Sequence, residues 1–107
     1  MIKFFSQLFK YDEEKKTAVQ MVEALRAVVS PKLMAEGKTV MSAKKISRAL
    51  ERIYEIARNY QSRRKAGAVR RAVFANKFKW ELKESGYPES FVDVAVEGLL
   101  VELGKAS

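Results

Sequence analysis

The 107-residue sequence predicts an all-α fold, a small helical bundle with four main helices and one or two short ones. It holds only five glycines and two prolines, too few for the many tight turns of an all-β fold. Between these turn residues, apolar residues recur at helical spacing. The contents of 48% hydrophobic and 32% charged residues are typical of a globular protein. We therefore expect residues 1–107 to form a single helical domain.

The first predicted helix is a short amphipathic N-terminal segment, residues 1–10. Residues 13–29 form a longer helix after Asp12, a favourable N-cap. Glu13 and Glu14 stand in its first turn, where the helix dipole favours acidic side chains. The apolar stripe of this longer helix consists of Ala18, Val22, Leu25 and Val29.

Two further helices are expected before residue 66. Ser30 and Pro31 mark the start of a short helix over residues 31–36, and Gly37 marks its end. Ser42 then caps a long helix over residues 43–65. The apolar face of the long helix consists of Ile46, Ala49, Leu50, Ile53, Ala57 and Tyr60.

The helix predicted over residues 68–85 is apolar on two sides. One stripe consists of Val69, Val73 and Trp80. The other, more than about 100° away around the helix, consists of Phe74, Phe78 and Leu82. A helix of this kind lies at the centre of its domain or is shared with a partner chain. We therefore expect a partner interface, formed by Phe74, Phe78, Trp80 and Leu82.

The last predicted helix covers residues 88–103, between Pro88 and Gly104, within an acidic C-terminal region, residues 84–107. Its inward residues are expected to be Phe91, Val92, Ala95, Val96, Leu99, Leu100 and Leu103.

The net charge of +8 is unevenly distributed along the chain. Residues 1–43 carry a net charge of +2, residues 44–83 carry +10, and residues 84–107 carry −4. A basic centre next to an acidic end predicts a polyanionic partner, or two molecules that meet head to tail. The alternative stays open that Lys and Arg are simply favourable residues on a helix surface.

Residues 59–71, NYQSRRKAGAVRR, concentrate the basic charge at a predicted corner between two helices. Cations favour the end of a helix, but Arg70 and Arg71 stand in a first turn, where they are mildly unfavourable. The sequence thus favours a small accessory or regulatory factor that binds the phosphate backbone of DNA or RNA. The predicted binding residues are Lys45, Arg48, Arg52, Arg63, Arg64, Lys65, Arg70 and Arg71.

Residues 41–50 resemble the second half of a helix-turn-helix motif at Met41, Ser42, Ile46 and Ala49. The resemblance implies that this helix faces a DNA major groove. The first half departs from the motif, because Glu36 stands where it has a small residue and Val40 where it has glycine. An ordinary capped amphipathic helix is therefore the favoured interpretation.

Several functional classes are disfavoured. The chain has no cysteine and no histidine, so we expect no metal and no cofactor, and we find no catalytic constellation. We therefore expect a non-enzymatic protein. The sequence GKT at residues 37–39 lacks the first glycine of a phosphate-binding loop, because Lys32 occupies that position. No apolar run approaches the length of about 20 residues that spans a bilayer, and we expect a cytoplasmic protein.

Two alternatives to nucleic-acid binding remain. The first is a protein–protein interaction module, an adaptor, inhibitor or self-associating subunit, that binds an acidic protein surface or forms a homodimer. The second is attachment to a membrane surface through residues 1–10, assisted by the basic centre.

Overall fold

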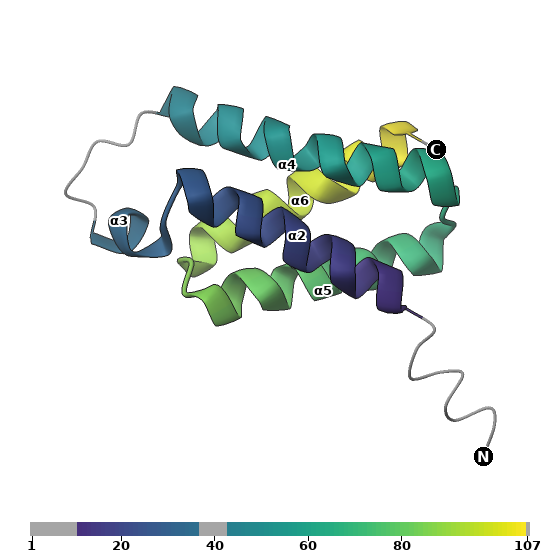
Figure 1. Ribbon diagram of the computed structural model, residues 1–107, viewed down its shortest axis with the longest axis horizontal. Coiled ribbons are helices and arrows are strands. Elements are labelled where there is room, and N and C mark those ends of the chain that lie inside the picture. Colours follow the sequence, from purple (N-terminus) through teal and green to yellow (C-terminus); the bar gives the residue numbers. More distant parts are fainter. Residues whose placement is uncertain (1–10, 37–42, 107) are drawn as a thin grey trace, which may run out of the picture.

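The computed structural model describes residues 11–36 and 43–106, and in these residues the chain forms helices and no strand (Figure 1). The prediction of a small all-α bundle is confirmed. The N-terminal segment 1–10, with its predicted membrane contact, lies outside the described residues, as do Met41 and Ser42. Within the described residues the helices are α2 (Asp12–Val28), α3 (Pro31–Glu36), α4 (Ala43–Arg64), α5 (Ala68–Ser85) and α6 (Glu89–Ala106).

The four long helices are not packed in the order of the sequence. Helix α2 lies between α4 and α5 and packs against both, and α6 packs against the same two helices from behind (Figure 1). Helices α4 and α5 follow each other in the chain but lie on opposite sides of the bundle. Helices α2 and α5 run in one direction, and α4 and α6 run in the other.

The helix ends follow the chemistry of their residues. The Ser30 hydroxyl oxygen accepts a hydrogen bond from the Leu33 amide at 3.1 Å, which caps α3 as predicted. Gly86 ends α5 with a φ of 99°, in the left-handed region that favours glycine, and its amide donates to the Lys83 carbonyl at 3.0 Å. Helix α6 does not end at Gly104 as predicted but continues to Ala106, since one glycine costs a helix only about 1 kcal/mol.

The core is formed by one apolar stripe from each long helix. The largest buried apolar side chains are Met21, Leu25, Ile53, Tyr60, Phe74, Phe78, Leu82, Leu99 and Leu103. The inward stripes predicted for residues 13–29 and 43–65 are confirmed, with Ile46 and Leu50 at the half-buried edge. In α6 the prediction is wrong for Leu100, which is 45% exposed.

Helices α4 and α6 approach closely at Gly98. The Tyr54 hydroxyl donates a hydrogen bond to the Ala95 carbonyl at 2.7 Å, so the Tyr54 ring lies across the backbone of α6. A Cβ atom at Gly98 would collide with the Tyr54 hydroxyl and lie 2.9 Å from its Cζ. Glycine is thus required here by the close approach of Tyr54, although it weakens the interior of a helix.

Candidate interaction surface

The basic corner between α4 and α5 is largely neutralised by the N-terminus of α2. Arg63 and Arg64 both form ion pairs with Glu13, with nitrogen–oxygen distances of 3.1 and 3.2 Å. All three side chains are partly exposed, so these ion pairs contribute little to stability. They nevertheless supply a protein partner for two of the residues that the sequence assigned to nucleic acid.

Arg70 also has a structural role. Its guanidinium lies 3.2 Å from a carboxylate oxygen of Glu14, which is fully buried. Tyr60 donates a second hydrogen bond to the same carboxylate oxygen. The hydrogen bond to Glu14 raises the pKa of Arg70 above its ordinary value, and burial together with the same carboxylate raises the pKa of Tyr60. The buried carboxylate therefore gives Arg70 a structural explanation, and its first-turn position does not require an external anion.

Glu14 is the important residue that sequence reasoning missed. It lies four residues before Ala18 and eight before Val22, so it falls on the apolar stripe of α2. A carboxylate on an apolar stripe predicts a buried ionic partner, and this signal was present in the sequence. The partner itself, about fifty residues further along the chain, was not predictable from spacing.

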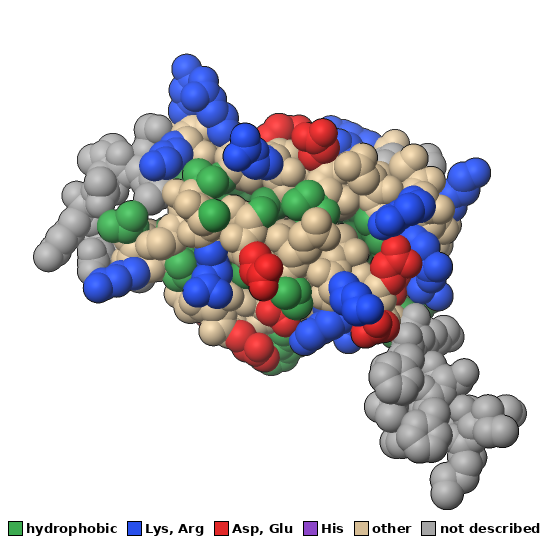
Figure 2. Space-filling model, in the orientation of Figure 1, with side chains coloured by type: hydrophobic (Ala, Val, Ile, Leu, Met, Phe, Trp, Pro, Cys, Tyr) green, Lys and Arg blue, Asp and Glu red, His purple; other side chains and the backbone are tan. Residues whose placement is uncertain are grey.

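The remaining predicted nucleic-acid residues fall into two separate groups. Lys45, Arg48 and Arg52 are exposed on the first half of α4, whereas Lys65 and Arg71 lie near the corner. About 30 Å of helix separates Lys45 from the end of α4. Figure 2 shows acidic side chains among the basic ones on this face of the molecule. The described residues thus do not present one continuous basic surface there.

Most of the predicted partner interface is part of the core. Phe74, Phe78 and Leu82 are fully enclosed by the chain's own helices, so a partner cannot touch them. That part of the prediction is wrong, because α2 and α6 cover this side of α5. Trp80, in contrast, is 54% exposed, and it lies on the other stripe together with Val69, which is 69% exposed.

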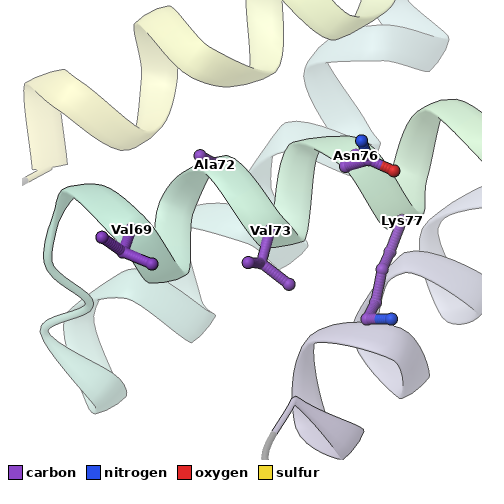
Figure 3. A pocket seen from close by; sticks show the side chains of 5 residues that line it. All are labelled: Val69, Ala72, Val73, Asn76 and Lys77. Carbon is purple, nitrogen blue, oxygen red and sulfur yellow. The ribbon is translucent and has the colours of Figure 1, made fainter.

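The exposed stripe of α5 forms an apolar surface beside α6. Val69, Val73 and Trp80 lie within about 60° of one another around the helix, on the side opposite the core. Figure 3 shows Val69 and Val73 projecting from the outer side of α5, while Lys77 extends toward α2. These residues, together with Ala72 and Asn76, line a shallow open groove.

Helix α6 extends this apolar surface. Leu100 and Gly104 line a second groove, which is completed by Ala68, Arg71 and Ala72 of α5. Val94 and Val101 are also exposed on α6. Within the described residues, five of the six large apolar side chains that are exposed belong to α5 and α6, and the sixth is Leu33 of α3. We call the outer sides of α5 and α6 together the α5–α6 face.

The described residues contain no group of three or more histidine, cysteine, aspartate or glutamate residues that could hold a metal ion. None of the helices in residues 11–36 and 43–106 is long and apolar enough to cross a membrane. Comparison of the chain with protein-family models, with curated proteins and with solved structures gives no match. The fold and the exposed α5–α6 face therefore define the class, a small all-α bundle with one apolar outer face.

Proposed function

We propose that this chain is a non-enzymatic protein-interaction module that binds a protein through its α5–α6 face. The observation that carries the proposal is the concentration of exposed apolar side chains on these two neighbouring helices. Scattered exposed apolar residues are normal on a monomer, but a contiguous apolar surface marks an interaction site. Trp80 is of the kind that fills a pocket in a partner surface.

The charges around the α5–α6 face agree with this function. Lys77, Lys79 and Lys83 border the stripe on α5, and Asp93 and Glu97 border it on α6. Charged residues beside apolar ones are usual in a protein interface, where the charges set the orientation of the partner.

The proposal is tested by placing a photoreactive amino acid at Val69, at Leu100 or at Gln20. Gln20 is exposed on α2, away from the α5–α6 face, and serves as the control. After irradiation in cells, we expect cross-links to protein from Val69 and Leu100 in clear excess over those from Gln20. Equal yields from all three positions would contradict the proposed surface.

A second candidate function, binding of a DNA or RNA backbone, is favoured by a separate observation on α4. Arg48 and Arg52 are exposed one helical turn apart, and neither forms an ion pair with a described residue. Residues 44–83 carry a net charge of +10. A phosphate backbone requires charge more than precise geometry, so even this limited surface suits it.

The second candidate is tested by binding a generic DNA duplex and a generic RNA between about 50 and 200 mM salt. If Arg48 and Arg52 each hold a phosphate, the double variant Arg48→Ala/Arg52→Ala lowers the salt slope by about two. The matched control is Arg63→Ala/Arg64→Ala, which removes two cations already paired with Glu13 and should change the slope less. No binding at about 50 mM salt would exclude this function.

A further inference from the structure

We propose that the partner of the α5–α6 face is a second copy of this chain. Helix α5 of each copy lies on α6 of the other, around a two-fold axis that runs parallel to both helices. The inference rests on the proposed function and names the occupant of the surface. A two-fold interface needs a surface that is complementary to itself, and the α5–α6 face has this property in its charge and in its apolar pattern.

The two helices carry opposite charges of equal size. Helix α5 has five basic and two acidic side chains, a net charge of +3, and α6 has one basic and four acidic side chains, a net charge of −3. Within the described residues no ion pair joins α5 to α6, so Lys79, Asp93 and Glu97 are not neutralised across this pair of helices. Lys83 lies 5.4 Å from the centre of the Trp80 ring. The charges of Lys79, Asp93 and Glu97 can therefore attract another copy of the chain.

The direction of the helices fixes which residues meet. Helices α5 and α6 run antiparallel, and the groove that Ala68 and Ala72 share with Leu100 and Gly104 shows that the start of α5 lies beside the end of α6. A two-fold axis parallel to the helices places each end of one copy on the same end of the other. Residues at equal distance from the turn between α5 and α6 therefore face each other across the interface.

At equal distances from this turn, a basic residue of one helix faces acidic residues of the other, and an apolar residue faces an apolar residue. At 1.5 Å per residue, Lys79 lies about 9 Å from the end of α5, and Asp93 and Glu97 lie about 6 and 12 Å from the start of α6. Further out, Ala72 lies at about 20 Å and Val101 at about 18 Å. The half of the interface near the turn thus holds the opposite charges together with Trp80 and Val94, each about 8 Å from the turn, and the distant half is mainly apolar.

The other two-fold arrangement is disfavoured by the same charges. An axis perpendicular to the helices would place α5 on α5 and α6 on α6. Two α5 helices, each with a net charge of +3, would then face each other, as would two α6 helices with a net charge of −3. Like charges brought together in an interface oppose association, so the pairing of α5 with α6 is selected.

The first measurement is the oligomeric state by sedimentation velocity between about 1 and 200 µM. We expect a monomer–dimer equilibrium within this range. Trp80 is the only tryptophan of the chain and reports directly on the interface. Its emission should shift to shorter wavelength, and its quenching by acrylamide should weaken, as the dimer forms. A monomer at every concentration would overturn the inference.

Charge reversal then tests which helices face each other. The variants Lys79→Glu/Lys83→Glu and Asp93→Lys/Glu97→Lys should each weaken the dimer at least about 10-fold, which is 1.4 kcal/mol. Combining all four substitutions in one chain should restore the affinity to near its original value. Weakening followed by restoration occurs only if α5 faces α6. Pairing α5 with α5 would oppose like charges in the parent and in every variant alike, so neither double variant would weaken that dimer. Circular dichroism confirms that each variant is folded.

Two outcomes separate this inference from the proposed function. If the chain stays monomeric but Val69 and Leu100 cross-link to a different protein, the second copy is rejected and the interaction module stands. If the chain is monomeric and neither position gives protein cross-links in excess of Gln20, both are rejected. A dimer that the combined charge reversal fails to restore rejects the pairing of α5 with α6.

Discussion

The inner and outer sides of α5 differ in their surroundings far more than in their composition. Phe74 and Phe78 are enclosed between α2 and α6, and the Phe74 ring lies edge-on to Tyr60 with ring centroids 4.7 Å apart. Val69 and Trp80 on the outer side are more than half exposed and bordered by lysines. The comparison teaches that one helix can build the core with one side and still present an apolar surface for association with the other.

Substitution of a large residue on each side gives the strongest test of this difference. Phe78→Ala should lower the free energy of unfolding by about 3–5 kcal/mol, because it leaves a cavity in a closed core. Trp80→Ala should change the stability of the monomer by about 0.5 kcal/mol or less. Chemical denaturation at low protein concentration measures both variants. Similar losses for the two would show that Trp80 belongs to the core.

Arg70 and Arg71 are adjacent in the sequence and differ in the same way, because Arg70 contacts a buried residue and Arg71 lies on the surface side of α5. Arg70→Ala leaves the buried Glu14 carboxylate without its cation and should destabilise the fold by about 2 kcal/mol, less than for a completely buried pair because Arg70 is partly exposed. Arg71 makes no ion pair with a described residue, and Arg71→Ala should cost about 0.5 kcal/mol or less. Equal effects in thermal unfolding would contradict the assigned role of Glu14.

Helix α6 offers a matched pair of glycines on two of its sides. Gly98→Ala adds a methyl group against Tyr54 and should destabilise by about 1–2 kcal/mol, the cost of overpacking less the gain in helix propensity. Gly104→Ala meets no heavy atom within 4 Å and should stabilise by about 0.5–1 kcal/mol. Gly98→Ala should therefore lower the denaturant concentration at the unfolding midpoint, and Gly104→Ala should raise it. A stabilising Gly98→Ala would show that Tyr54 does not press on α6.

Loss of the Tyr87 hydroxyl should have a modest effect on stability at neutral pH and should change how stability depends on pH. Its hydroxyl donates to the Val29 carbonyl at 2.6 Å, so Tyr87→Phe should cost about 1 kcal/mol at pH 7. Burial raises the pKa of Tyr87 to about 12. Because the unfolded chain ionises first, this contribution is complete below about pH 10 and declines as the pH rises toward 12.

Denaturation at pH 7, 10 and 11 therefore distinguishes Tyr87→Phe from the parent chain. The parent should lose stability above pH 10 more steeply than the variant, by at most about 1.4 kcal/mol per pH unit. Parallel curves for the two proteins would place the Tyr87 hydroxyl in water instead of on Val29.

The sequence was sufficient for the helices and for most of the core. Gly86 and the Ser30-Pro31 pair mark helix boundaries through local backbone chemistry, and the inward stripe of α2 follows from helical period alone. The two stripes of α5 were also recognised, but which one faces inward depends on how α2 and α6 pack against it. The pairing of Glu13 with Arg63 and of Glu14 with Arg70 joins distant residues, and no local pattern encodes such contacts.

The position of α2 between α4 and α5 has a consequence for the rate of folding. In a bundle whose neighbouring helices are consecutive in the sequence, each helix packs against the one before it, and only a short loop separates the two contacting segments. Here α5 barely touches α4 and must instead find α2 across the whole stretch from Val29 to Gly67. Contacts between distant residues lower folding rates, since chain entropy is lost before they form. We expect this bundle to fold more slowly than a sequentially wound one of the same length, with α5 the last of the first three long helices to become ordered.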